Sequence, residues 1–311
     1  MGKTPSSIIG TSGLKSLGLA GAVLLSGLSG TAAAADPETA QAAPSDDAII
    51  VEGIKDKARA IDHYVRALTV VHAGEPLPRY EEGSYCPAVV GLSAERNTDM
   101  EARMRRVAEA AAVKPAALPC RTSALVLFVD DKEAFLKAFR KAHPVYFSDP
   151  STKHWSPPRE TGPATAWHLT QRLDSKGSPG SSAGGIKVFE SSFGGSHLME
   201  MTKPVIVMSV VVIERRALIG LTPVQVADYA LMRTLTDSAP KNMDDTAANT
   251  ILTAIDTEPG GETAASLTEW DFAYVRGRYA TPPFRNGHSQ GAAISAAVKR
   301  ETMQEEKTER D

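Results

Sequence analysis

The chain has 311 residues, of which 34 are Lys or Arg and 37 are Asp or Glu, so its formal net charge is −3 at pH 7. This acidic balance disfavours nucleic acid as a partner, and no stretch combines a basic stripe with the regularly spaced aromatic residues that a nucleic-acid groove needs. The length is sufficient for one large domain or two small ones with a sizeable core.

The first 35 residues have the layout of a secretory signal peptide. Lys3 and Lys15 supply the positive start, residues 17–28 the apolar centre and residues 33–35 the small-residue cleavage site. The apolar segment is too short and too rich in Gly and Ser to span a bilayer, which takes about 20 predominantly apolar residues. We therefore expect cleavage after Ala35 and a periplasmic or secreted protein with no membrane span. An uncleaved amphipathic anchor is the alternative.

Residues 36–53 are expected to be a flexible leader, because their Ala, Asp, Glu, Thr and Gln bury little apolar surface. Cleavage of the signal peptide removes two lysines and no acidic residue, which takes the formal charge from −3 to −5. Within this leader, residues 48–53 resemble the short energy-coupling box near the mature start of outer-membrane receptors. So short a match often arises by chance, and we expect a short strand that joins the sheet edge instead.

The chain contains two cysteines, Cys86 and Cys120, and both lie in the part expected to be exported. An oxidising compartment makes a disulfide between them the expectation. Each stands beside a proline, Pro87 or Pro119, which places it in a loop next to a structured segment. A nucleophilic cysteine is the competing interpretation, but it lacks a neighbouring histidine and leaves the other thiol unexplained.

Residues 54–172 are expected to form a first lobe that contains the disulfide. Apolar residues at three- and four-residue steps indicate amphipathic helices, and short continuous apolar runs indicate buried strands. Trp167 is expected to be a core or ligand-facing anchor. In chain order the predicted elements are a helix over 54–72, a helix over 98–113, a strand over 123–129, a helix over 132–142 with Asp130 or Asp131 as its cap, and a strand over 164–169.

Residues 173–185 are rich in Ser and Gly and are expected to be a linker to a second lobe over 186–282. The linker lacks the Gly-Lys-Ser/Thr ending of a phosphate loop. Residues 283–311 are expected to form a polar helical or disordered tail. The predicted elements of the second lobe are a strand over 204–213, a helix over 223–235 opened by a capping box of Thr222 and Gln225, a helix over 246–255, and a helix over 267–279 capped by Thr268.

The strand at 204–213, the Gly-Leu-Thr turn after it, the helix at 223–235 and residues 267–279 resemble the closing part of uncharacterised exported bacterial proteins related to zincin metallopeptidases. In such families the helix carries His-Glu-x-x-His, which binds zinc and activates a water molecule. Here the helix contains no histidine, and Asp228 is its only carboxylate. The resemblance therefore implies a zincin-like scaffold for 186–282 without zinc catalysis, and we expect no metal and no cofactor.

The seven histidines are scattered, and none stands three or four residues from another. A metal site would therefore need a purely tertiary gathering of ligands. His168 follows a tryptophan, which is more typical of packing than of a site. Ser196 and His197 adjoin in a Gly-rich segment, but they lack the Gly-x-Ser-x-Gly pattern of a nucleophile elbow, so a turn is the better interpretation.

The predicted helix over 267–279 ends in aromatic and basic residues. We expect its rings to seat the helix on the sheet, and Asp271 to pair with Arg278 or with a distant partner. A surface that faces an anionic or sugar-like ligand is the functional alternative.

Together these patterns predict an α/β (α+β) fold in two packed lobes, the second on a zincin-like scaffold. The leading hypothesis is an exported, non-catalytic periplasmic or cell-surface protein that binds a partner or a small ligand, because a complete export signal stands beside incomplete chemistry. The alternative is a divergent zincin-like hydrolase with a non-standard site. Its residues would be Asp228, His168 or His197, and Asp271, gathered in space.

Overall fold

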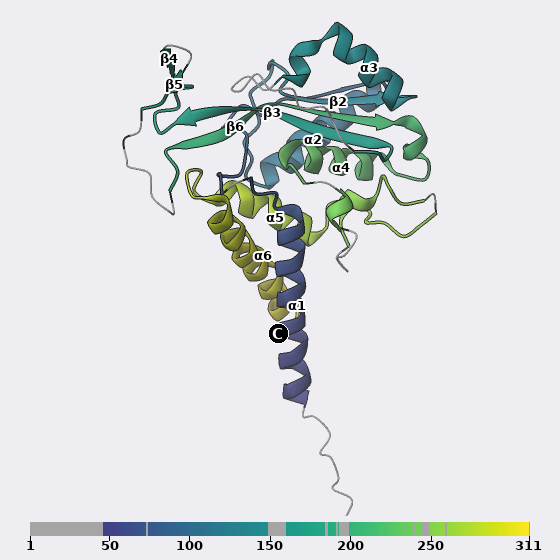
Figure 1. Cartoon of the computed structure of the whole chain (residues 1–311). Helices are drawn as coiled ribbons and strands as arrows, with labels where there is room; N and C mark the ends of the chain where they lie inside the picture. Colours follow the sequence, from purple (N-terminus) through teal and green to yellow (C-terminus); the bar gives the residue numbers. More distant parts are fainter. Residues whose placement is uncertain are drawn as a thin grey trace, which may run out of the picture. The chain divides into compact units, whose positions relative to one another are not determined.

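A four-stranded mixed sheet forms the centre of the protein (Figure 1). We describe it from a computed structural model, which covers residues 46–72, 74–148, 160–183, 186–190, 192, 199–238, 240–243, 249–258 and 260–310. The strand order is β1-β2-β6-β3, with β1, β2 and β6 parallel and β3 antiparallel to β6. The strands are β1 (Pro87–Val90), β2 (Ala124–Val129), β3 (Ala164–Asp174) and β6 (Thr202–Glu214).

The two inner strands, β2 and β6, have continuous apolar runs because both of their faces are buried. Successive side chains of a strand point to opposite faces of the sheet. On β6, Val211 and Ile213 accordingly belong to one hydrophobic core, whereas Val210 and Val212 belong to the other. The α/β class predicted from the sequence is confirmed.

Helices cover both faces of the sheet (Figure 1). On one face lie α2 (Ala94–Ala110) and α4 (Pro223–Leu235), which bury residues such as Met104 and Leu231 in the larger core. On the other face lie α3 (Lys132–Ala142) and the 3-10 helix η1 (Pro144–Phe147), over the smaller core. The sheet is thus the middle layer of three.

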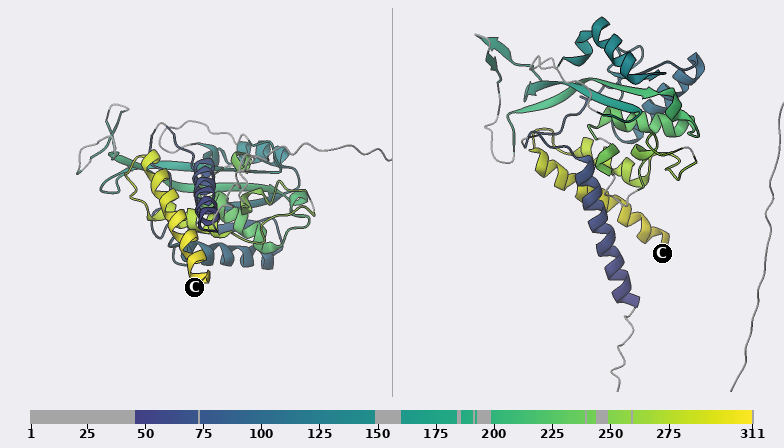
Figure 2. Two further views of the ribbon diagram at one scale, coloured as in Figure 1. Left: turned by 90° about the horizontal axis from the view of Figure 1, so that it is seen from below. Right: turned by 45° about the vertical axis from the view of Figure 1, so that its right-hand side comes forward.

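A further group of helices extends the larger core beyond α4, as Figures 1 and 2 show: α1 (Asp46–Leu68), α5 (Glu269–Ala280) and α6 (Gly287–Arg310). Ile294 and Val298 of α6 and Tyr64 of α1 are fully buried in this core. Gly277 allows α5 and α6 to approach closely, since a Cβ built there would lie 3.3 Å from the Cβ of Ala297.

The predicted helix starts that rest on capping residues are confirmed. Asp131 caps α3, and Thr222 with Gln225 forms the capping box of α4. Thr268 caps α5, with Asp271 as its reciprocal partner. These side chains satisfy backbone N–H groups that the helix itself leaves without acceptors, which is why they mark the ends so clearly. The strand predicted over 123–129 and the helix predicted over 132–142 are also found.

The predicted division into two lobes is wrong for the described residues, which belong to one folded unit from Asp46 onward. Strand β3 of the expected first lobe pairs along its whole length with β6 of the expected second lobe. The segment 173–185 therefore joins antiparallel neighbours in one sheet. Its described part contains a turn at Asp174 and β4 (Ser181–Ala183), which pairs with β5 (Ile186–Val188).

Two predictions near the chain ends also need correction. Helix α1 begins at Asp46, so residues 48–53 are helical and are neither leader nor edge strand. For the tail over 283–311 the helical alternative is confirmed by α6, but this helix is packed, with buried Ile294 and Val298. Small residues let this helix approach its neighbours closely, as Ala297 does at Gly277 of α5, and apolar periodicity does not reveal such a contact.

The helix predicted over 246–255 is absent from the part of that segment that the structure describes, where the 3-10 helix η4 (Ile251–Thr253) stands. Two more 3-10 helices, η2 (Arg215–Leu218) and η3 (Pro240–Met243), precede and follow α4. Among the helices described, none has both the length and the apolar content that crossing a membrane requires.

The disulfide predicted between Cys86 and Cys120 is present, with the Cα atoms 6.2 Å apart. Cys86 immediately precedes β1, and Cys120 lies shortly before β2. The bridge therefore joins the chain entering the edge strand to the chain entering its inner neighbour.

Replacing both cysteines by serine should lower the free energy of unfolding by about 4 kcal/mol, because the bridge closes a loop with a sequence separation of 34 residues. Urea denaturation of the wild type and the double variant measures this difference. A reductant should bring the wild type to the value of the variant and leave the variant unchanged. Equal stability of the oxidised wild type and the variant would contradict the prediction.

Candidate functional site

A cavity of about 770 Å³ lies on the face of the sheet that α3 and η1 cover in part. We call it the α3-side groove. Its volume falls within the range of small-molecule sites, which is about 300–1,000 Å³. It is lined by Gly83, Ser84, Ala116, Arg121, Thr122, Ser123, Val145, Tyr146, Ser148, Leu169, Val207 and Met208.

The floor of the groove is a β-bulge between β3 and β6. Leu169 pairs with Met208 and Thr170 pairs with Ile206, so Val207 has no partner in the register. A bulge bends its strand and redirects side chains, and bulges are frequent beside functional sites. Val207 keeps 36% of its surface exposed although it lies in the middle of an apolar strand. The bulge therefore gives the groove an apolar floor of Leu169, Val207 and Met208.

Trp167 supports one wall. Its ring stacks on Phe147 with the centroids 5.1 Å apart, and its Nε1 donates a hydrogen bond to the backbone oxygen of Tyr146 at 2.6 Å. This arrangement holds η1, and with it the Val145 and Tyr146 wall, against the sheet. The prediction that Trp167 is a core anchor is confirmed, since it is 6% exposed.

The disulfide supports the opposite wall, which comes from the segments that precede β1 and β2. Ser123 Oγ donates to the backbone oxygen of Ser84 at 2.7 Å and accepts from the backbone N–H of Cys86 at 2.8 Å. Tyr80 Oη donates to the backbone oxygen of Ser123 at 2.7 Å. The Ser123 hydroxyl is thus occupied in joining the two segments, which assigns it to the wall and not to nucleophilic chemistry.

Asp228, predicted as a weak catalytic candidate, is fully buried on α4. Its carboxylate accepts hydrogen bonds from Arg103 Nε at 2.8 Å and Nη2 at 2.7 Å, and from the backbone N–H of Leu267 at 2.9 Å. Breaking such a pair leaves an uncompensated buried charge, so it is costly. Asp228 therefore ties α2 to α4 and to the chain entering α5.

Asp271 is also fully buried, at the start of α5. Its carboxylate accepts from Tyr64 Oη at 2.6 Å and Thr250 Oγ1 at 2.5 Å, and from the backbone N–H groups of Ile251 at 2.9 Å and Thr268 at 3.0 Å. A negative charge is favoured at a helix N-terminus. At this terminus the two carboxylates accept from neighbouring backbone N–H groups, Asp228 from Leu267 and Asp271 from Thr268. Each has its own complete set of donors. Because both side chains are fully buried, neither can contact a substrate.

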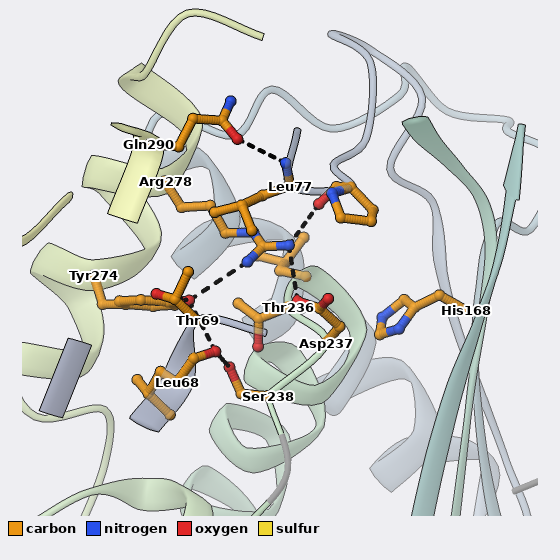
Figure 3. A network of polar contacts seen from close by, with 12 residues as sticks. Leu68, Thr69, Leu77, His168, Thr236, Asp237, Ser238, Tyr274, Arg278 and Gln290 are labelled. Carbon is orange, nitrogen blue, oxygen red and sulfur yellow. Dashed lines mark hydrogen bonds and ion pairs between the residues drawn. The ribbon is translucent and has the colours of Figure 1, made fainter. Parts of the chain in front are cut away.

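Of the two partners predicted for Asp271, the distant one is found, in Tyr64 and Thr250, and the pairing with Arg278 is not. Arg278 is 1% exposed and donates to Asp237 Oδ1 at 2.9 Å and to the backbone oxygen of Pro78 at 2.7 Å (Figure 3). Arg278 Nη1 also donates a hydrogen bond to Tyr274 Oη at 3.4 Å. This network joins α5 to the segment after α4, because Asp237 lies just beyond the end of that helix.

His168 lies on β3 near the same network (Figure 3). Burial lowers its pKa to about 4, although the carboxylate of Asp237 acts in the opposite direction. The ring is therefore neutral at pH 7, and Nε2 donates to the backbone oxygen of Thr234 at 3.2 Å. This hydrogen bond joins β3 to the end of α4. His197 lies outside the described residues.

The prediction placed the rings of α5 on the sheet, but two of them, Trp270 and Tyr274, contact α1. Tyr64 of α1 makes edge contacts with Trp270 at 5.4 Å and with Tyr274 at 6.3 Å between centroids. In the part of the chain that the structure describes, no group of three or more His, Cys, Asp or Glu side chains is arranged to hold a metal ion.

Comparisons with protein-family models, curated proteins and solved structures found no match to this chain. The resemblance to zincin-related exported proteins thus stays a prediction. The helix and strand that carry this resemblance are α4 and β6, and β6 is an inner strand of the sheet because it lies between β2 and β3.

Sequence reasoning missed the groove residues because none of them belongs to a motif. Val207 and Met208 stand in a continuous apolar run, and Val145 and Tyr146 follow a helix end. The sequence shows that the two cysteines lie close to Ser84 and Arg121. It does not show the bulge that opens the floor, because the bulge depends on the pairing of β3 with β6. The only usable signal was the disulfide, which implied that the two wall segments meet.

Stability should fall as the pH is lowered from 6.5 to 4, because the unfolded state protonates His168 in this range while the folded state does not. At about 1.4 kcal/mol per pKa unit, the pKa difference corresponds to a loss of about 3 kcal/mol in the free energy of unfolding. Because part of the ring is accessible to solvent, we expect a loss of about 1–3 kcal/mol. His168→Gln keeps a donor for Thr234 and should flatten this part of the profile. Denaturation at several pH values checks it, and an equal slope in both proteins would contradict it.

Proposed function

We propose that this protein is an exported, non-catalytic binding protein that takes a small, largely apolar ligand in the α3-side groove. The observation that carries the proposal is the groove itself, which combines a volume of about 770 Å³ with an apolar floor and two braced walls. A concave, mostly apolar pocket with a few polar groups is the usual form of a ligand site. Asp228 and Asp271, by contrast, are fully buried.

Export is supported by two independent features. The first 35 residues have the charge, apolar centre and small-residue site of a signal peptide. The disulfide between Cys86 and Cys120 fits an oxidising compartment, where such bonds persist. We therefore place the working protein in the periplasm or outside the cell, as a molecule that binds a ligand in that compartment.

The non-catalytic part of the proposal is supported by the bonding of the candidate residues. Asp228 holds Arg103, Asp271 holds four donors, and His168 is neutral and bonded to Thr234. A general base must reach the proton it abstracts directly or through one water molecule. These groups instead join elements of the fold, so the divergent hydrolase has no observation in its favour among the described residues.

Binding in the groove is tested with Nile red, a neutral apolar fluorophore, and the oxidised chain from residue 36 onward. Val207→Trp should weaken binding by about tenfold or more, because a larger side chain fills the floor and tenfold corresponds to only about 1.4 kcal/mol. Fluorescence titration measures the dissociation constant.

The matched control is Val224→Trp on α4, since Val224 has the same exposed fraction of 36% as Val207 but lies outside the groove. It should bind Nile red as the wild type does. Denaturation of both variants establishes that they remain folded. If the wild type does not bind the fluorophore, or if both variants bind it equally, the groove is not the site.

Export is tested by expressing the full chain in a bacterial host and sequencing the N-terminus of the protein recovered from the periplasm. The sequence should begin at Asp36, because the small residues before it form the cleavage site. Replacing Lys3 and Lys15 by glutamate should retain the protein in the cytoplasm. A full-length wild-type chain found in the cytoplasm would contradict the proposal.

A further inference from the structure

We infer that the α3-side groove takes an anionic amphiphile, meaning an apolar chain or ring that ends in an anionic group, and that Arg121 binds the anionic end. The inference rests on the proposed function, because it concerns the ligand of the same groove. It follows from the charge of the lining, the state of Arg121 and the position of the apolar floor.

The lining of the groove is asymmetric in charge. Among the described residues that line it, Arg121 carries a formal positive charge and none carries a negative one. The remaining polar groups are hydroxyls, and the floor is Leu169, Val207 and Met208. Such a lining favours a ligand with one anionic end and an apolar remainder, because a cationic or purely polar ligand would lose its hydration without compensation.

Arg121 is free to bind an anion. Its side chain is exposed and has no ion pair or hydrogen bond with any residue that the structure describes. Glu82, which precedes Gly83 of the lining, is already paired with Lys114 at 2.8 Å, and Asp149, which follows Ser148 of the lining, lies outside the described residues. A guanidinium presents a planar fork of donors that matches a carboxylate or phosphate.

The disulfide fixes the backbone from which Arg121 projects. Arg121 directly follows Cys120, and Arg105 donates to the backbone oxygen of Ala116 in the same wall segment. Ser123, two residues further on, is held to Ser84. The backbone on both sides of Arg121 is thus restrained, which reduces the entropy lost when the side chain binds a ligand.

The negative net charge of the whole chain strengthens the inference that Arg121 binds the anionic end of the ligand. With the signal peptide removed, the formal charge is −5, so the protein as a whole repels anions. Binding of an anionic amphiphile therefore requires a local positive group, and within the groove this group is Arg121.

The test compares three ligands with the same ten-carbon chain: decanoate, decanol and decyltrimethylammonium, below the concentrations at which they form micelles. Displacement of Nile red from the oxidised protein reports binding to the groove. The wild type should bind decanoate tighter than decanol by about tenfold, and decanol tighter than the cation. Arg121→Gln should weaken decanoate binding about tenfold and leave decanol binding unchanged.

Arg106→Gln is the matched control, since Arg106 is an exposed arginine of α2 that does not line the groove. It should leave all three affinities unchanged. Salt should weaken decanoate binding to the wild type and have little effect on Arg121→Gln, because screening acts on the charge contact. Decyl phosphate in place of decanoate distinguishes a phosphate ligand from a carboxylate.

Equal binding of decanoate and decanol to the wild type, or equal losses in Arg121→Gln and Arg106→Gln, would overturn this inference while binding of Nile red upheld the groove as a site. Failure of the wild type to bind Nile red would instead overturn the proposed function. The two failures are therefore distinguishable in one set of titrations.

Discussion

The pairing of β6 on both of its edges is the constraint on which the rest of the structure depends. This strand of 13 residues runs parallel to β2 on one side and antiparallel to β3 on the other. Its alternating side chains enter both hydrophobic cores, and α4 follows it directly through a short 3-10 turn. Because β6 joins elements from both halves of the chain, the halves cannot fold as separate lobes. The same pairing contains the bulge that opens the floor of the groove.

The groove exists because the two faces of the sheet are covered unequally. Helices α2 and α4 cover one face, and α1, α5 and α6 extend the core beyond them. On the other face, α3 and η1 protect Val210, Val212 and Trp167, and the adjoining part of the face remains open over the bulge. The disulfide and the Ser123 hydrogen bonds close the far side. The apolar groove, with one cation in its lining, therefore results from this unequal covering of the sheet.

The buried polar residues show how the same side-chain types can serve stability alone. Asp228 with Arg103 and Asp237 with Arg278 are ion pairs whose loss would leave a buried charge without a partner. Asp271 occupies the N-terminus of α5 and satisfies hydroxyl and backbone donors of three segments. From the sequence, Asp228 and Asp271 were candidates for chemistry, because they are titratable residues in or beside the helices that resemble a zincin-like scaffold. In the structure they join helices, and the candidate site consists of residues without a motif.

The sequence by itself determined the local features, because their causes lie within a few residues: the capping residues that start α3, α4 and α5, the apolar runs of β2 and β6, and the two cysteines that pair. It could not determine the single folded unit, the packing of α6 or the partners of Asp271 and Arg278, since each depends on contacts between residues far apart in the chain. The small residues of α6 carry almost no periodic signal, and its burial follows from close approach to α5. The groove is the clearest case: Val207 lies in an ordinary strand sequence, and only the register between β3 and β6 exposes it beside Arg121.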